Sequence, residues 1–142
     1  MLRVRRWLVG LFVLGVLGPV WTEVKAQASR TLKFEIYQDA KQEYRWRLKA
    51  TNSQIIATSG EGYTAKSNCR HAIDVIKRDA DTAKLTFETY QDAKQEYRWR
   101  LKSPNGQIIA ASGQGYSAKR DCDHAIDVIK KGAEGAQIGE IP

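Results

Sequence analysis

The chain contains one segment twice, and this internal repeat limits its possible folds more than any other feature. The thirteen residues YQDAKQEYRWRLK occur at 37–49 and again at 90–102. Residues 32–78 align without a gap with residues 85–131, and 35 of the 47 aligned pairs are identical. Self-similarity of this extent indicates two copies of one supersecondary unit.

Each copy predicts three strands. In the first copy, apolar and polar residues alternate over 32–38 and over 43–49, as they do in half-buried strands. The segment QIIATS predicts the third strand. In the second copy, Asn105-Gly106 after Pro104 is a strong hairpin signal between the second and third strands.

A helix follows the third strand of each copy. Its apolar residues fall on one stripe, and Thr64 or the equivalent Ser117 is a plausible N-cap. One copy of about 50 residues is small for independent stability, so we expect the two copies to share a core. The predicted fold is α+β, with two tandem β-β-β-α(-β) repeats in one mainly antiparallel sheet and both helices on one face. Residues 136–141 predict a short final strand.

The first 28 residues have the layout of a secretory signal peptide. Three arginines precede an uncharged apolar stretch, and Ala26-Gln27-Ala28 matches a cleavage pattern. We therefore expect an exported protein, periplasmic or secreted, whose single domain spans 29–142. An uncleaved membrane anchor is the alternative, although 15 apolar residues are fewer than the roughly 20 that span a bilayer. Cleavage would lower the formal net charge from +7 to about +4.

The repeat resembles the YegP-like family of small bacterial proteins, which are built from tandem copies of a domain of unknown function. The resemblance rests on EYRWRLK, on the following IIA and GY, and on the helical Cys and Ala-Ile of both copies. It implies two β-β-β-α-β units in one sheet with exchanged C-terminal strands, and it implies no agreed activity. Where many relatives have a glycine before the second strand, this chain has Gln42 and Gln95, so the first turn is expected to differ. Many relatives also lack an export signal.

Basic residues alternate with the apolar residues of the second strand in both copies. On a sheet whose other face carries the helices, they would share the open face with Tyr37 and Tyr90, which suggests a polyanion-binding surface. Export makes nucleic acid an unlikely partner and an anionic envelope polymer a better one. The alternative is a solvated face with cross-strand pairs to Glu35 and Glu88. The candidate residues are Arg45, Arg47, Lys49, Arg98, Arg100 and Lys102.

A second candidate site is the Gly-x-Gly turn before each helix. Backbone N–H groups at such a turn can bind an anion, with a lysine adding positive charge. The motif lacks the spacing of the known phosphate-binding loops, so a turn that needs the backbone freedom of glycine is the alternative. The residues are Gly60, Gly62, Lys66, Gly113, Gly115 and Lys119.

Cysteine and histidine occur once each in both predicted helices. Cys69 lies on the apolar stripe and His71 about 200° away, so one zinc ion cannot easily bind both. Buried thiols are the main expectation for Cys69 and Cys122, and a disulfide is the alternative. We expect no metal, no cofactor and no enzyme activity, because no nucleophile or paired carboxylates stand out. The predicted function is a binding or structural module of unknown partner.

Overall fold

The computed structural model describes residues 31–142, which form one compact unit, Thr31–Pro142. The predicted signal peptide lies outside the described residues. The first repeat contains the strands β1 (Lys33–Gln38), β2 (Tyr44–Lys49) and β3 (Ile55–Ser59), followed by the helix α2 (Lys66–Asp79). The second repeat contains β4 (Thr86–Gln91), β5 (Tyr97–Lys102), β6 (Ile108–Ser112), α3 (Lys119–Gly132) and the final strand β7 (Gln137–Glu140). None of the helices in this described part is long and apolar enough to cross a membrane.

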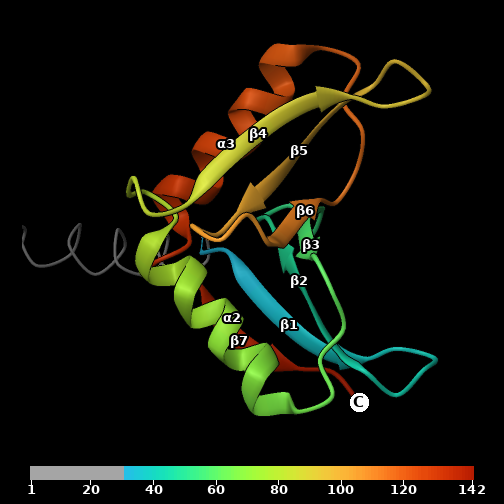
Figure 1. Cartoon of the computed structure of the whole chain (residues 1–142), viewed down its shortest axis with the longest axis vertical. Coiled ribbons are helices and arrows are strands. Elements are labelled where there is room, and N and C mark those ends of the chain that lie inside the picture. Colours follow the sequence, from blue (N-terminus) through green and yellow to red (C-terminus); the bar gives the residue numbers. More distant parts are fainter. Residues whose placement is uncertain (1–30) are drawn as a thin grey trace, which may run out of the picture. The chain divides into compact units, whose positions relative to one another are not determined.

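The strands form one sheet in the order β4-β5-β6-β3-β2-β1-β7 (Figure 1). The two repeats join where β3 pairs with β6 in the antiparallel direction, and Thr58 lies opposite Ala111, its counterpart 53 residues along the chain. The two repeats are therefore related by an approximate twofold axis through this pair. Because an axis between antiparallel neighbours is normal to the sheet, both helices lie on the same face, as predicted.

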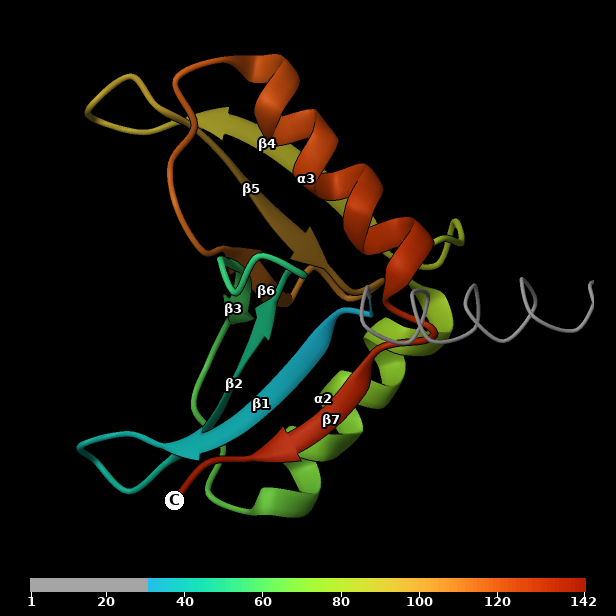
Figure 2. The same ribbon diagram turned by 180° about the vertical axis from the view of Figure 1, so that it is seen from behind.

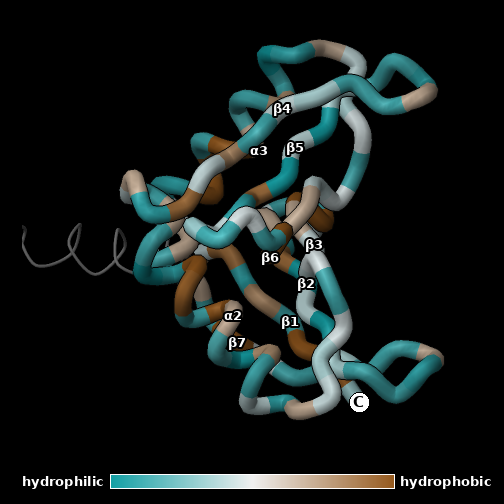
Figure 3. Tube along the Cα trace, in the orientation of Figure 1, coloured by the Kyte–Doolittle hydropathy of each residue, from teal (hydrophilic) through white to brown (hydrophobic). Residues whose placement is uncertain are grey.

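The core lies between that face and the helices. Trp46 and Trp99 are 1% and 0% exposed, and each packs edge-on against a phenylalanine ring with centroids 5.3 Å apart. α2 packs against β1 and β2, and α3 packs against β4 and β5 (Figures 1 and 2). Hydrophobic segments of the strands and helices face one another, whereas the hairpin loops are mainly hydrophilic (Figure 3). Strand alternation thus correctly predicted which face of the second strands is buried.

Local details of the turns differ from the sequence-based predictions. The helix N-caps are Ala65 and Ala118, and neither side chain makes a capping hydrogen bond, so the predicted caps Thr64 and Ser117 are wrong. Gln42 has a left-handed φ of 64° and Gln95 one of 62°. Glutamine therefore adopts the conformation that a glycine provides more easily, and the first turn keeps a glycine-type backbone.

β7 completes the sheet by crossing to the other repeat. It follows α3 of the second repeat but pairs in parallel with β1 of the first repeat (Figure 2). Gln137 N–H donates to the Leu32 carbonyl at 3.0 Å, and Ile141 N–H donates to the Ile36 carbonyl at 2.8 Å. β7 therefore covers the outer edge of β1. β4, the counterpart of β1 in the second repeat, ends the described sheet on the other side.

Candidate functional site

The six basic residues of the open face form ion pairs with carboxylates of their own repeat. Arg47 Nε donates to Glu35 Oε2 at 2.8 Å, and Lys49 Nζ lies 3.1 Å from the same oxygen. In the second repeat, the equivalent groups of Arg100 and Lys102 lie 2.9 and 2.7 Å from Glu88 Oε2. β1 and β2 pair so that Glu35 lies directly opposite Arg47, which brings the charges together.

The remaining arginine of each set pairs with the aspartate of the first turn. Asp39 Oδ1 accepts the backbone N–H groups of Lys41 and Glu43, and its Oδ2 accepts Arg45 Nε at 2.6 Å. The equivalent Asp92 holds Arg98 at the same distance. The turn and the second strand are thus connected by one carboxylate in each repeat.

These pairs lower the pKa of each carboxyl group. Hydrogen bonds from Arg100 and Lys102 lower the pKa of Glu88 to about 2. Burial tends to raise the pKa of Glu35, but the hydrogen bonds from Arg47 and Lys49 outweigh it and the pKa is lowered. The carboxylates stay ionised at neutral pH, so the predicted basic face is largely neutralised by its own acids.

The glycines of the two Gly-x-Gly turns are required by close packing. A side chain at Gly60 would overlap the Ile108 carbonyl of the other repeat, and Gly113 lies equally close to the Ile55 carbonyl. The N–H groups of Gly60 and Gly113 donate across the repeat junction, each at 3.2 Å, to Ile109 and Ile56. These two donors are therefore already used. The second glycine of each turn, Gly62 or Gly115, lies against the side chain of Glu43 or Glu96.

The two turn lysines have different partners. Lys66 Nζ donates to Glu140 Oε2 on β7 at 2.9 Å and lies 5.7 Å from the Tyr44 ring centre. Lys119 Nζ instead donates to Asp123 within its own helix at 2.7 Å. Hydrogen bonds to these carboxylates raise the pKa of both lysines. The structure does not bring the two predicted anion turns together into one site.

The cysteines and histidines do not form a metal site in the described residues. Cys69 and Cys122 are free and fully buried, which confirms the prediction of buried thiols. Burial raises the pKa of Cys69 to about 11. His71 and His124 are exposed. No group of three or more potential metal ligands occurs within residues 31–142.

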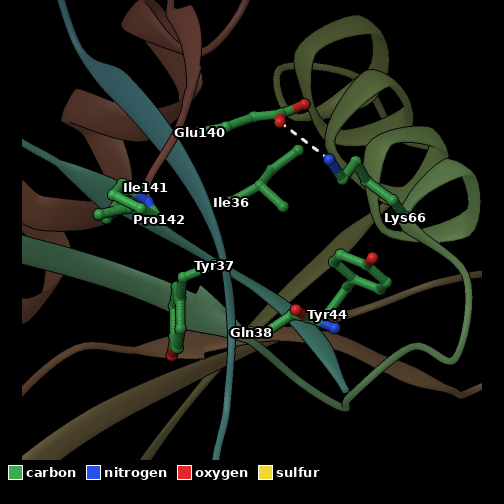
Figure 4. Close-up of a pocket in the computed structure, with 8 residues that line it drawn as sticks. All are labelled: Ile36, Tyr37, Gln38, Tyr44, Lys66, Glu140, Ile141 and Pro142. Atoms are coloured by element: carbon green, nitrogen blue, oxygen red, sulfur yellow. Dashed lines mark hydrogen bonds and ion pairs between the residues drawn. The ribbon is translucent and has the colours of Figure 1, made fainter. Parts of the chain in front are cut away.

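A pocket of about 300 Å³ opens between β1, β7 and the start of α2 (Figure 4). Lys66 and Glu140 form an ion pair on one side of it, and both side chains are about half exposed. Tyr44 lies beside Lys66, and aliphatic groups line much of the rest. The lining residues are Ile36, Tyr37, Gln38, Tyr44, Lys66, Glu140, Ile141 and Pro142.

Sequence reasoning found Lys66 but missed the pocket. Three of the lining residues, Glu140, Ile141 and Pro142, belong to β7 or directly follow it, and they meet α2 only because β7 crosses to β1. Lys66 and Glu140, which form the ion pair, lie 74 residues apart in the sequence. The apolar tail after α3 predicted a strand, and the family resemblance implied that this strand crosses to the other repeat, which the pairing of β7 with β1 confirms. Neither signal indicated that Glu140 would meet Lys66.

Comparisons with known proteins agree with the architecture. The domain of unknown function DUF1508 matches residues 39–86 and 92–140. A UPF0339 protein encoded in the region 5' of the ptx operon of Stutzerimonas stutzeri is 36% identical over 109 residues, which are 76% of this chain and 95% of the relative. A UPF0339 protein of Neisseria meningitidis serogroup B is 70% identical over 44 residues, which are 31% of this chain and 77% of that relative. The shorter relative is therefore about as long as one repeat.

Solved structures show the same fold. The solution structure of a UPF0339 protein from Shewanella oneidensis superposes with a TM-score of 0.69 at 25% identity, covering 78% of this chain and 91% of the other. The E. coli protein yegP, of unknown function, gives a TM-score of 0.68 at 24% identity, covering 78% and 92%. With its two matched repeats and its seven-stranded sheet, the chain belongs to the DUF1508 family.

Proposed function

We propose that the protein is an exported, non-enzymatic binding module whose ligand site is the pocket between β1, β7 and α2. The observation that supports this proposal is the Lys66–Glu140 ion pair at a pocket whose other walls are apolar and aromatic except for Gln38. Ligand pockets typically combine apolar walls with a few polar groups that orient the ligand. The volume of about 300 Å³ suits a small molecule.

The pocket chemistry favours a compact zwitterion with an apolar body, such as a free amino acid. Its carboxylate would bind Lys66 and its ammonium group would bind Glu140, which replaces one ion pair by two. Its apolar part would lie against Ile36, Ile141 and the Tyr44 ring. Because the Lys66–Glu140 pair is half exposed, it exchanges with a ligand at small cost.

The test is titration of the ¹⁵N-labelled protein with leucine and phenylalanine, followed by NMR. We expect saturable shifts at Ile36, Tyr44 and Lys66, and none with N-acetyl-leucine amide, which lacks both charges. Lys66→Met should abolish the shifts, whereas Lys119→Met in the second repeat should leave them unchanged. Absence of shifts with either amino acid, or shifts that persist in Lys66→Met, would contradict the proposal.

Polyanion binding through the open face is the second candidate, with an anionic envelope polymer as the partner. Two equivalent rows of basic residues, on β2 and β5 of the same sheet with β3 and β6 between them, favour it, and their ion pairs weaken it. Retention on heparin at physiological salt tests it. If the open face binds polyanions, replacing Arg45, Arg47, Arg98 and Arg100 by glutamine should move elution from heparin to lower salt. Unchanged elution of this folded variant would remove the candidate.

Export is part of the proposal and rests on the layout of residues 1–28. Sequencing the N-terminus of the protein from its native source tests it, and the expected first residue is Ser29. A native protein that starts at Met1 or Leu2 would contradict export by cleavage.

A further inference from the structure

The two edges of the sheet differ in how well they are protected against pairing with another strand. β7 has four residues, contains Gly139, and is followed closely by Pro142. β4 has six residues and pairs regularly with β5 at all six positions, without a bulge, proline or glycine. Natural edge strands usually avoid association through shortness, charged side chains, proline or bulges, and of these β4 has only one charged residue, Glu88.

The backbone of β4 presents the groups that β1 uses to hold a further strand. The carbonyls of Ile36 on β1 and of Leu32, directly before β1, accept hydrogen bonds from the segment that contains β7. The repeat offset of 53 places Leu85, Phe87 and Thr89 at the equivalent outward positions. Within the described residues no strand lies beside them, because β4 ends the sheet. In a strand, N–H and C=O of one residue point to the same side, so Thr89 offers both outward.

The side chains of β4 allow a second copy of the same strand to lie beside it. Glu88 is the single charged residue of β4, and it is already neutralised by Arg100 at 2.9 Å and Lys102 at 2.7 Å. Tyr90, at 37% exposed, is one of two large hydrophobic residues exposed in the described part. Two β4 strands therefore meet without excess like charge, and association covers an exposed aromatic ring.

We propose that β4 is a self-association edge through which two copies of this chain form an antiparallel, twofold-symmetric dimer. The register that avoids opposing the two Glu88 side chains places Thr89 opposite Thr89 of the partner and Glu88 opposite the partner's Tyr90. The contact repeats the way in which the two halves of this chain already join, since β3 and β6 pair antiparallel around Thr58. Cyclic pairing of this kind is closed and does not extend into a fibre.

Proline at Thr89 gives a sharp test. The backbone N–H of Thr89 points away from β5. Proline at this position therefore removes a donor from the free edge but leaves the pairing with β5 intact, and proline is tolerated at such edge positions. Sedimentation of the wild-type protein over increasing concentration should show a monomer–dimer equilibrium. Thr89→Pro should shift it to monomer by at least tenfold in the dissociation constant. Thr89→Val, which keeps the N–H group, is the matched control and should still dimerise.

Two measurements keep the proposal falsifiable if Thr89→Pro does not fold. Tyr90→Glu places a carboxylate opposite the partner's Glu88 in the proposed register and should also weaken the dimer tenfold or more, because like charges directly opposite each other are unfavourable. Amide hydrogen exchange of Phe87 and Thr89 in the wild type should slow as concentration rises. A wild-type protein that is monomeric at millimolar concentration overturns the proposal, as does a dimer that persists unchanged in Tyr90→Glu. A peptide of residues 136–142 that binds β4 of a protein monomeric at all concentrations also overturns it, because the edge then takes a strand in the manner of β1.

Discussion

The Glu–Arg–Lys cluster occurs in both repeats with the same residue types, but its carboxylate is buried in only one. The side chain of Glu35 is 10% exposed, and that of Glu88 is 41% exposed. The arginine distances, 2.8 and 2.9 Å, are almost equal. Two features differ: Gly139 of β7 lies beside Glu35 in the parallel register, and Lys33 Nζ lies 3.7 Å from Glu35 Oε1. In the second repeat, Thr86 replaces this lysine and no strand lies beside β4 in the described part. Burial here depends partly on a distant strand.

Several sequence differences between the repeats follow the same asymmetry. Ile36 is 2% exposed beneath the covered edge, and the equivalent Thr89 lies at the open one. Arg70 lies 3.8 Å from Glu140 of β7, and the equivalent position holds Asp123, which pairs with Lys119 instead. The second repeat thus supplies from its own helix the carboxylate that the first repeat takes from β7.

The largest expected effect should be equal in the two repeats. Trp46→Ala and Trp99→Ala each should lower the free energy of unfolding by about 3–5 kcal/mol, because each removes a buried aromatic ring. The two losses should agree within about 1 kcal/mol, since both side chains are almost fully buried. Urea denaturation measures both. A much milder effect of Trp99→Ala would show that the asymmetry of the edges extends into the core.

Giving each of the equivalent positions Ile36 and Thr89 the residue of the other repeat should change stability by different amounts. Ile36→Thr should cost about 2–4 kcal/mol, because it removes buried hydrocarbon and introduces a buried hydroxyl group. Thr89→Ile should change stability by less than about 0.5 kcal/mol, since this position is at a partly exposed edge. Thermal unfolding of both variants is the measurement. Equal losses would contradict the protective role assigned to β7.

Replacing the arginine that pairs with each glutamate should also cost different amounts of stability in the two repeats. Arg47→Gln should lower stability by about 1–3 kcal/mol, because it removes a donor from the buried carboxylate of Glu35. Arg100→Gln should have little effect, since water can replace the lost donor at the exposed Glu88. Chemical denaturation at low salt compares them. A loss for Arg100→Gln as large as that for Arg47→Gln would refute the difference.

The loop between the second and third strands provides a smaller contrast. Ser53 adopts a left-handed φ of 68°, and its counterpart Gly106 has a φ of 83°. Ser53→Gly should stabilise the protein by about 1 kcal/mol, and Gly106→Ser should destabilise it by a similar amount, because a side chain is unfavourable in this conformation. Melting temperatures should therefore move in opposite directions.

The smallest expected effect is the pH dependence contributed by Glu88. Its pKa is about 2 in the folded protein and 4.5 for the unperturbed group, so its contribution to stability is present above pH 4.5 and is lost as pH falls towards 2. Wild type should lose more stability than Glu88→Gln across this window. Parallel thermal unfolding curves from pH 5 to 2 measure the difference, and identical slopes would count against the ion pairs at Glu88.

Much of the fold was predictable because the signals are local. Alternation in EYRWRLK correctly placed Trp46 and Arg47 on opposite faces, and the helix stripe correctly placed Cys69 in the core. The candidate sites were less predictable. The rows of basic residues are visible in the sequence, and the alternative of cross-strand pairs to Glu35 and Glu88 is confirmed by the ion pairs, with Glu35 opposite Arg47 in the strand register. The pocket required Glu140 to meet Lys66.

The sequence by itself determined the two-repeat architecture, the order of strands and helices, and the buried face of the second strand in each repeat, because hydrophobic periodicity and turn residues act over short distances. Only the tertiary structure decided where β7 lies, why Gly60 and Gly113 must lack side chains, and which of two equivalent glutamates is buried. These features arise where backbones from different repeats approach one another. Contacts of this kind depend on how the two copies close around their shared axis, and 35 of the 47 aligned pairs, being identical, say nothing about where the two copies differ.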